Sequence, residues 1–392
     1  MSKLDELIQK LCPDGVEYRK IGEVTNYEQP SKYIVRNTDY RDEYETPVLT
    51  AGQSFVLGYT NESDGIYPAS KATPVIIFDD FTAAFKWVNF PFKVKSSAMK
   101  MITANESQLL IRFLFHWMGA LNYSSTEHTR LWIGTYSEFK IPVPPLPVQR
   151  EIVRILDNFT ELTAELTAEL TARKQQYAYY RDKLFDSYSE VDTKKIGKLT
   201  RVFSASRVHK DEWTNEGVPF FRSSDVVSAF NGGKNTRGKA YISRELYERL
   251  SAKSGKIEKD DILVTGGGTI GIPYIIPNDA PIYVKDADLI CIKRNEHILS
   301  KFLYHYFCST KFRDYLKSIT HNATIAHYTI TQIENTPVPV FPLKEQARIV
   351  SILDRFDTLC TDLSSGLPAE IEARQKQYEY YRDKLLTFTP AD

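Results

Sequence analysis

One short motif in the chain fits the pattern of a dinucleotide site. Residues 266–271 read GGGTIG, which matches GxGxxG after a predicted strand. A dinucleotide site needs a helix next, because the helix N-terminus binds the pyrophosphate. Residues 272–277, IPYIIP, instead predict extended chain. We therefore expect a turn between strands and no dinucleotide site.

Two further motifs are similar to those of enzymes that act on DNA, and both are incomplete. Residues 89–92, NFPF, differ from the Asn-Pro-Pro-Phe motif of adenine-N6 methyltransferases at Phe90, and no glycine-rich cofactor motif precedes them. Residues 138–140, EFK, match the ExK of many nucleases, but no suitable partner carboxylate can be named. No GxxxxGK[ST] loop occurs, so no ATP motor is encoded. We expect no catalytic residue.

Histidine and cysteine give no sign of a metal site. The seven histidines form no HxxxH pair, and the four cysteines, at positions 12, 291, 308 and 360, form no CxxC pair. This pattern predicts neither zinc nor disulfides and fits a reducing cytoplasm. The charged N-terminus is unlike a signal peptide, and the most apolar helix-like stretch, residues 109–121, is too short and too polar to span a bilayer. We expect a cytoplasmic protein with no membrane partner.

Charge sets a limit on how the chain would bind nucleic acid. The chain has 392 residues, with 50 basic and 50 acidic side chains. Neutralisation of phosphate charge dominates the affinity of proteins for nucleic acid. A net charge of zero therefore argues against a protein that binds nucleic acid without partners. Only residues 187–342 are basic, with 22 basic and 17 acidic side chains, against 15 and 17 in residues 1–147.

The strongest feature is an internal repeat. Residues 141–146, IPVPPL, return as residues 338–343, VPVFPL, and residues 176–184, QYAYYRDKL, return as residues 377–385, QYEYYRDKL. The offset grows from 197 to 201 residues, and four extra residues make close to one helical turn. The layout is therefore a globular region of residues 1–147, a helix of residues 148–186, a globular region of residues 187–342 and a helix of residues 343–392.

The first repeat predicts one long helix with a single apolar stripe. Spacings of three and four place apolar side chains on one face, and they include Leu162, Leu166, Leu170, Tyr177 and Tyr180. The helix would span roughly 55–60 Å, which requires a partner helix. The second copy is the obvious partner, with a break at residues 364–368. Residues 163–170 contain two Thr-Ala-Glu-Leu units.

The globular regions predict mixed helix and sheet. Residues 74–78 and 261–265 predict buried strands, and residues 109–119 and 300–316 predict helices. The expected fold class is α+β, with two pseudo-symmetric globular domains and two long helices that pair with each other.

The junctions, the TAEL units and residues 366–385 together resemble the specificity subunit of type I restriction-modification enzymes, and the TAEL units resemble its IC branch. The resemblance covers essentially the whole chain. It implies two pseudo-symmetric target-recognition domains joined by two long antiparallel coiled-coil helices. Each of these domains would read one half of a bipartite site on double-stranded DNA. It also implies that the helices dock two methyltransferase subunits, with restriction and translocase subunits further out. The chain itself would hold no cofactor, whereas partner subunits would use S-adenosylmethionine, ATP and Mg²⁺.

Independently of the resemblance, two related domains on a pseudo-symmetric spacer are typical of a DNA reader with two half-sites. The domains differ in sequence, so the half-sites should differ too. Base-reading side chains are expected on polar loops. In the first region the candidates are Thr50, Gln53, Ser54, Lys71, Lys86, Ser124, Ser125, Thr126, His128 and Arg130. In the second they are Arg207, His209, Lys210, Arg222, Ser223, Ser224, Asn231, Lys234, Asn235, Arg237, His321, Asn322 and Thr324.

Two other classes of protein remain open. The chain could be a fused DNA methyltransferase or nuclease, although the missing motifs argue against an enzyme. It could also be a purely structural coiled-coil scaffold, which selective capture of one bipartite DNA sequence would exclude.

Overall fold

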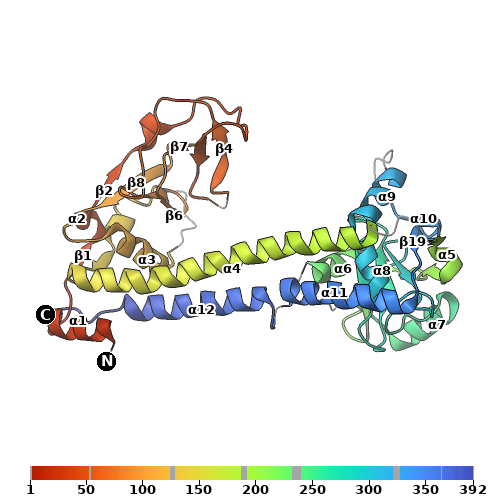
Figure 1. The fold of residues 1–392 in the computed structure, drawn as a ribbon. Coiled ribbons are helices and arrows are strands. Elements are labelled where there is room, and N and C mark those ends of the chain that lie inside the picture. Colours follow the sequence, from red (N-terminus) through yellow and green to blue (C-terminus); the bar gives the residue numbers. More distant parts are fainter. Residues whose placement is uncertain are drawn as a thin grey trace. The chain divides into compact units, whose positions relative to one another are not determined.

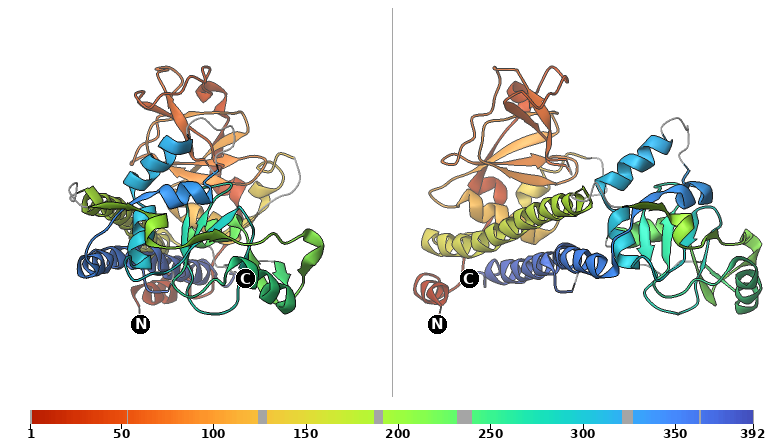
Figure 2. Two further views of the ribbon diagram at one scale, coloured as in Figure 1. Left: turned by 90° about the vertical axis from the view of Figure 1, so that its right-hand side faces the viewer. Right: turned by 45° about the vertical axis from the view of Figure 1, so that its right-hand side comes forward.

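A computed structural model describes residues 2–52, 54–123, 129–186, 192–231, 240–320, 327–362 and 364–391. It divides into two units, Met1–Glu165 with Glu372–Asp392, and Leu166–Ile371. The helix α4 (Leu146–Asp186) belongs to both units and is one continuous ribbon in Figure 1 and in the right view of Figure 2. The second copy of the repeat forms two helices, α11 (Leu343–Thr361) and α12 (Leu367–Leu385).

The described part of the first unit contains three sheets and, beside the long helices, the α-helices α1, α2 and α3. An antiparallel sheet has the order β2-β8-β5-β6, a second has the order β4-β3-β7 with β3 parallel to β7, and β1 pairs with β9. The elements are α1 (Lys3–Leu11), β1 (Tyr18–Lys20), α2 (Ile21–Val24), β2 (Thr25–Glu28), η1 (Pro30–Tyr33), β3 (Thr46–Leu49), β4 (Val56–Thr60), β5 (Val75–Asp79), β6 (Phe85–Val88), β7 (Lys93–Val94), β8 (Met99–Ala104), α3 (Ile111–Leu121), η2 (Tyr136–Glu138) and β9 (Lys140–Pro142).

The second unit repeats this topology with one additional strand, β12, at the edge of its second sheet. Its sheets have the orders β11-β18-β15-β16, β12-β14-β13-β17 and β10-β19, and β13 is parallel to β17. The elements are β10 (Thr193–Lys195), α5 (Ile196–Leu199), β11 (Val202–Ser204), η3 (Lys210–Glu212), β12 (Trp213–Thr214), β13 (Val218–Phe221), α6 (Ser223–Phe230), β14 (Ala240–Ile242), α7 (Arg244–Ser254), β15 (Ile262–Thr265), β16 (Pro273–Ile275), β17 (Tyr283–Val284), β18 (Leu289–Ile292), α8 (Ser300–Phe307), α9 (Thr310–Thr320), α10 (Ile330–Asn335) and β19 (Pro337–Pro339). The α+β, pseudo-symmetric fold is confirmed.

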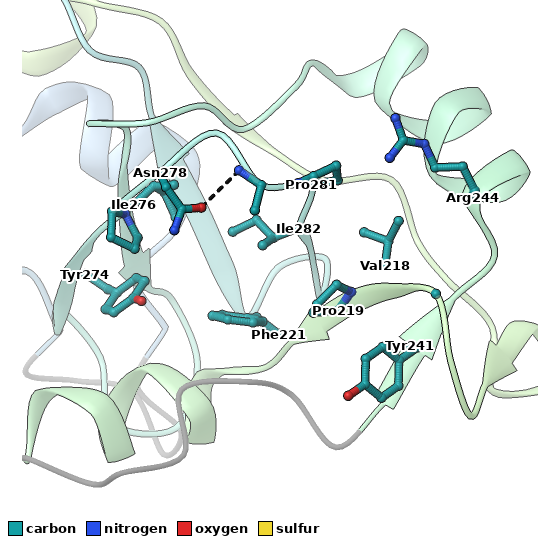
Figure 3. A pocket seen from close by; sticks show the side chains of 13 residues that line it. Val218, Pro219, Phe221, Tyr241, Arg244, Tyr274, Ile276, Asn278, Pro281 and Ile282 are labelled. Carbon is teal, nitrogen blue, oxygen red and sulfur yellow. Dashed lines mark hydrogen bonds between the residues drawn. The ribbon is translucent and has the colours of Figure 1, made fainter.

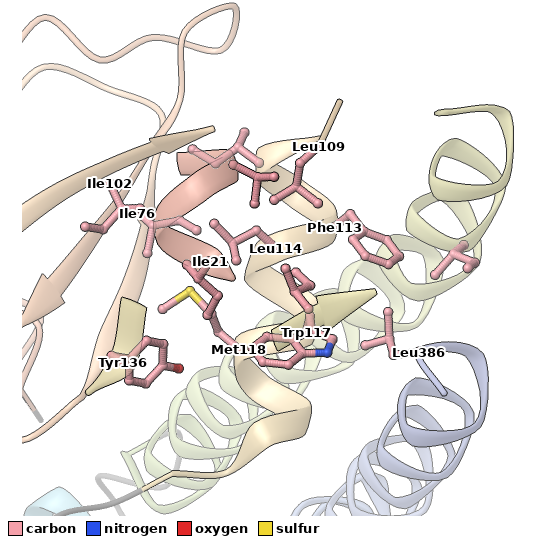
Figure 4. Close-up of a cluster of buried hydrophobic side chains, with 14 of the residues drawn as sticks. Ile21, Ile76, Ile102, Leu109, Phe113, Leu114, Trp117, Met118, Tyr136 and Leu386 are labelled. Carbon is pink, nitrogen blue, oxygen red and sulfur yellow. The ribbon is translucent and has the colours of Figure 1, made fainter. Parts of the chain in front are cut away.

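Each unit packs its sheet and one helix onto the long helices. In the first unit, Phe113 and Trp117 of α3 belong to the same apolar core as Ile152 of α4 and Leu386, one residue beyond α12 (Figure 4). In the second unit, Phe302 of α8 shares a core with residues of α4 and α11. Burial of such apolar area is the main favourable term in folding.

The long helices pair antiparallel within each unit. In the first unit the Phe159 ring of α4 stacks on the Tyr381 ring of α12, with 5.4 Å between centroids. In the second unit the Tyr177 and Tyr180 rings of α4 both stack on Phe356 of α11. Of the predicted spacer residues, Tyr177 and Tyr180 therefore make helix–helix contacts. Leu166 and Leu170 are only half-buried, and Leu162 is 37% exposed, so the stripe is not buried along its middle.

Two boundaries differ from the sequence prediction. The first helix begins at Leu146 instead of residue 148, because Pro147 is tolerated in a first helical turn. Residues 300–316 were expected to form one helix, and this prediction is wrong. Ser309 separates α8 from α9, since its hydroxyl donates to the Tyr306 carbonyl at 2.6 Å and accepts from the Phe312 N–H at 3.3 Å. A serine at this place caps the new helix.

Candidate nucleic-acid interface

In the first unit, three loop segments meet where the central strand β5 ends. The Asp80 N–H donates to the Ala98 carbonyl at 2.8 Å, and the Leu131 N–H donates to the Asp80 carbonyl at 2.7 Å. The Lys95 N–H donates to the Leu49 carbonyl at 3.1 Å, which joins the loop after β3 to the segment after β7. We call these five residues the first loop edge.

The second unit forms the same backbone frame at the end of β15. The Gly266 N–H donates to the Asp288 carbonyl at 2.8 Å, and the Tyr328 N–H donates to the Gly266 carbonyl at 2.9 Å. The Lys285 N–H donates to the Phe221 carbonyl at 2.8 Å. These five residues form the second loop edge. Two sequences that share little outside the long helices thus converge on one arrangement of loops.

The first-domain candidates are only partly brought together. Thr50 and Ser54 follow β3 at the loop edge, and Arg130 directly precedes Leu131. Lys71 is exposed but lies before β5 begins, at the opposite end of that strand from Asp80. Lys86 was expected on a loop and instead lies within β6, paired with Ile77, so that placement is wrong. Gln53, Ser124, Ser125, Thr126 and His128 lie outside the described residues.

A buried ion pair that the sequence did not reveal supports the first loop edge. Lys100 Nζ lies 2.9 Å from Asp80 Oδ2, and both side chains are buried. The other Asp80 oxygen accepts the Trp132 N–H at 2.8 Å, and Arg130 Nη1 lies 3.9 Å from Asp80 Oδ2. Asp80 therefore fixes the backbone next to Arg130 while the Arg130 side chain stays exposed.

Only some of the second-domain candidates lie at the second loop edge. Arg222 and Ser223 directly follow β13 at the loop edge, but both side chains have partners. The Ser223 hydroxyl donates to the Asp288 carbonyl at 2.9 Å, and Arg222 Nε lies 3.4 Å from Asp225 Oδ2. The exposed candidates elsewhere are Arg207, His209, Lys210, Ser224 and Asn231. Lys234, Asn235, Arg237, His321, Asn322 and Thr324 lie outside the described residues.

The glycine-rich motif forms a turn, as predicted. It connects the antiparallel strands β15 and β16, in which Ile262 pairs with Ile275. The Thr265 hydroxyl holds the turn by donating to the Thr269 carbonyl at 2.6 Å and accepting from the Ile272 N–H at 2.9 Å. No helix follows, so the geometry of a dinucleotide site is absent from this described segment.

A hollow of about 550 Å³ lies in the second unit beside β13 and β16 (Figure 3). Its walls include Phe221, Tyr241 and Tyr274, with Arg244 at one side. Arg244 already pairs with Glu248, at 2.9 Å between Nη2 and Oε1. The lining side chains include no histidine, cysteine, lysine or carboxylate. Tyr241, Tyr274 and the paired Arg244 are the ionisable side chains that line it.

A buried polar network in the first unit joins α3 to both long helices. His116 of α3 is fully buried, its Nε2 lies 2.8 Å from Asp157 Oδ1 of α4, and its Nδ1 lies 3.0 Å from the Tyr378 hydroxyl of α12. We call these three residues bridge 1. The network assigns the Nε2–H tautomer, with the Tyr378 hydroxyl donating to Nδ1.

The second unit contains the same arrangement, which we call bridge 2. His305 of α8 is 1% exposed, its Nε2 lies 2.9 Å from Asp354 Oδ1 of α11, and its Nδ1 lies 3.0 Å from the Tyr177 hydroxyl of α4. In both bridges the aspartate and the tyrosine come from different copies of the repeat.

Burial and neighbouring charges set the protonation state of bridge 1. Burial lowers the pKa of His116, and the positive charge of Arg112 lowers it further. Burial acts to raise the pKa of Asp157, but the hydrogen bond from His116 and the charge of Arg112 bring it below its ordinary value. The bridge therefore holds a neutral imidazole against a carboxylate.

The spacing of the histidines along the sequence does not predict the bridges. The sequence nevertheless contains a signal, because residues 113–117, FLFHW, return as residues 302–306, FLYHY. The offset of this match is 189 residues and not the 197 of the helical repeat, so the match lies outside the register of that repeat.

Comparison with known proteins identifies the family. Residues 13–173 and 188–373 match the family described as the type I restriction modification DNA specificity domain. The chain belongs to this family. It is also 42% identical over 406 residues to the type I restriction enzyme EcoR124I/EcoR124II specificity subunit of Escherichia coli, covering 99% of this chain and 98% of that protein.

Solved structures agree on the fold. The S subunit of a type I restriction-modification system from M. genitalium superposes with a TM-score of 0.57 at 14% identity, covering 95% of this chain and 96% of that one. A chain from a study of the assembly and conformational transition of the type I R-M system gives a TM-score of 0.59 at 17% identity, covering 95% and 98%.

The chain is thus a non-catalytic specificity subunit with a role in DNA sequence recognition. Among the described residues, no group of three histidine, cysteine, aspartate or glutamate side chains is placed to hold a metal ion. Nor does the described part of this specificity subunit include a helix long and apolar enough to cross a membrane.

Proposed function

We propose that this specificity subunit reads an asymmetric, bipartite site on double-stranded DNA. Residues 1–147 would read one half-site and residues 187–342 the other, on a spacer made of residues 148–186 and 343–392. The main support for this proposal is the pair of loop edges, which share the same pattern of backbone hydrogen bonds but carry different side chains. One frame with different side chains suits two half-sites of different sequence, because base edges are read by side-chain hydrogen bonds.

At the first edge, Thr50, Ser54 and Arg130 are the described residues proposed to face DNA. At the second edge, Ser224 and Asn231 are exposed at the two ends of α6, with Arg207 and Lys210 on the preceding segment. The remaining predicted residues stay candidates. With a net charge of zero, the chain is proposed to depend on its partners for much of its affinity for DNA.

The partners are proposed to be two methyltransferase subunits, with restriction and translocase subunits joining further out. Support comes from two tyrosines at equivalent positions of the repeat, Tyr179 and Tyr380, which are 59% and 63% exposed. The fold explains their identical neighbours: Tyr177 and Tyr378 complete the bridges, and Tyr180 and Tyr381 stack on phenylalanines. An exposed aromatic side chain kept in both copies suits a partner present twice. S-adenosylmethionine, ATP and Mg²⁺ would be used by those partners.

The test is sequencing of N6-methyladenine in cells that carry this chain with its partner subunits. We expect one bipartite sequence with a fixed spacer and different half-sites. Exchange of residues 1–141 for the matching region of a relative should then change one half-site and leave the other unchanged. A chimera in which both half-sites change together would refute the assignment of one domain to each half-site, and methylation without any bipartite sequence would refute the function itself.

A further inference from the structure

The two bridges have the same hydrogen-bond geometry, although their equivalent residues are separated by three different sequence offsets. His116 and His305 are 189 residues apart, Asp157 and Asp354 are 197 apart, and Tyr177 and Tyr378 are 201 apart. Insertions and deletions have therefore accumulated between the members of each bridge. Even so, the four N···O distances agree within the range of 2.8–3.0 Å. A geometry kept through three different offsets indicates a role that depends on that geometry.

We propose that the bridges are positioning elements, which fix the orientation of each recognition domain on its pair of long helices and thereby the spacing between the half-sites that the subunit reads. The inference rests on the proposed function, since it assumes a bipartite site. It adds the residues that hold each domain at its angle. None of these residues would touch DNA.

The apolar core alone does not fix the angle between a recognition domain and the long helices. The core between α3 and the long helices, with Phe113, Trp117 and Ile152, is stabilised by burial of area, which has no preferred direction. Such a contact holds the domain on the helices but resists rocking only weakly. A hydrogen bond weakens steeply when its distance or angle departs from the optimum, so bridge 1 adds the directional restraint.

The origin of the two partners makes the bridge sensitive to both helices. Asp157 lies on α4 and Tyr378 on α12, and one imidazole binds both. A shift of one helix along the other by a single residue is about 1.5 Å. That shift would break one of the two hydrogen bonds, because both are near 3 Å already. The imidazole is thus correctly bound only when the helices are in register.

In each bridge, a cationic side chain on the same helix as the histidine forms an ion pair with the aspartate. Arg112 Nε lies 2.7 Å from Asp157 Oδ1, and its guanidinium lies over the Trp87 ring at 4.6 Å. In bridge 2, Lys301 Nζ lies 2.5 Å from Asp354 Oδ2. The cation is an arginine in the first unit and a lysine in the second, so the two units share the arrangement of charges and not the residue type.

The experiment uses the complete methyltransferase complex containing Tyr378→Phe or Tyr177→Phe, each of which removes one hydroxyl and leaves the ring. Methylation rates are measured on DNAs that carry both half-sites with the native spacer, or with one base pair more or fewer. Loss of one hydrogen bond corresponds to about a fivefold change in an equilibrium. We expect the preference for the native spacer over the altered spacers to fall about fivefold in either variant, with both half-sites unchanged.

Tyr306→Phe is the matched control, because Tyr306 follows His305 on α8 and its hydroxyl donates to the Pro337 carbonyl at 2.7 Å, a hydrogen bond that involves neither a bridge residue nor a long helix. It should keep the full preference. If the two bridge variants lose thermal stability but keep the spacer preference, the bridges serve folding only and the inference is wrong. If the unmodified complex itself methylates every spacer equally, the proposed function fails, and the inference fails with it.

Discussion

Gln149 and Gln346 make the same three hydrogen bonds in different units. Gln149 Oε1 accepts from the Leu110 N–H at 2.8 Å, and Gln346 Oε1 accepts from the Leu299 N–H at 2.9 Å. Each amide nitrogen donates to two carbonyls, those of Gln108 and Pro144 in one unit and those of His297 and Phe341 in the other. Both glutamines are fully buried, so each fixes the junction between a recognition domain and a long helix.

Gln149→Leu is therefore expected to lower the free energy of unfolding by about 2–4 kcal/mol, because it leaves a buried N–H and two carbonyls without partners. Urea unfolding of the purified chain measures the change. Gln175→Leu, an exposed position on α4, should stay within about 0.5 kcal/mol of the parent. Equal losses in the two variants would contradict a specific role for Gln149.

Bridge 1 predicts a pH dependence of stability. Burial holds the pKa of His116 below its ordinary value of 6.5, so the unfolded chain takes up the proton first as the pH falls. The contribution is present above about pH 6.5 and is lost as the pH falls through the lower pKa of the folded state. The charged and titratable groups facing the ring are Arg112, Asp157, Tyr378 and Arg382.

We expect the free energy of unfolding to fall between pH 7.5 and pH 5.5, and to fall less in His116→Gln than in the parent. The measurement is urea unfolding at both pH values. His297→Gln, at an exposed position, should keep the slope of the parent. A slope unchanged in His116→Gln would show that His116 titrates alike in the folded and unfolded chain.

The exposed tyrosines predict where a partner binds. Tyr179→Ala and Tyr380→Ala together should weaken binding of the methyltransferase subunit at least tenfold, because buried aromatic anchors at interfaces contribute about 2 kcal/mol or more. Titration calorimetry with the purified subunit measures the affinity, and either single variant should reduce the stoichiometry or weaken one of two sites. Lys174→Ala, also exposed on α4, is the control. Full binding by the double variant would remove these tyrosines from the interface.

Much of the architecture could be predicted because it depends on local sequence patterns. The repeat, the prolines before Leu146 and Leu343, and the break near Gly366 gave the long helices to within a few residues. Lys86 was misplaced because a lone lysine in an apolar run does not distinguish a strand from a loop. The Asp80–Lys100 pair and the bridges depend on residues brought together by the fold, across 20 to 262 positions of sequence. Periodicity carries no information about such contacts.

The TAEL units predict that α4 measures the distance between half-sites. Residues 163–170 lie between Asp157 of bridge 1 and Tyr177 of bridge 2 on one unbroken helix, so an added unit moves these two residues apart along α4. Both bridges then keep their register only if the segment between α11 and α12 extends by a matching amount. The threonine hydroxyls bond to the helix itself, as Thr171 does to the Thr167 carbonyl at 3.0 Å. One more unit lengthens the helix by about 6 Å and turns it by about 40°.

Base pairs rise about 3.4 Å, so full transmission of 6 Å would lengthen the spacer by just under two base pairs, and an inclined helix would lengthen it by nearer one. Variants with one, two and three units, mapped by N6-methyladenine sequencing, should show spacers that grow by one or two base pairs per unit with both half-sites unchanged. Insertion of two residues instead of four turns the downstream helix by about 200° and should abolish methylation, because the apolar stripe no longer faces its partner. A spacer that is the same for one, two and three units would show that the repeat is only a tolerant run of good helix formers.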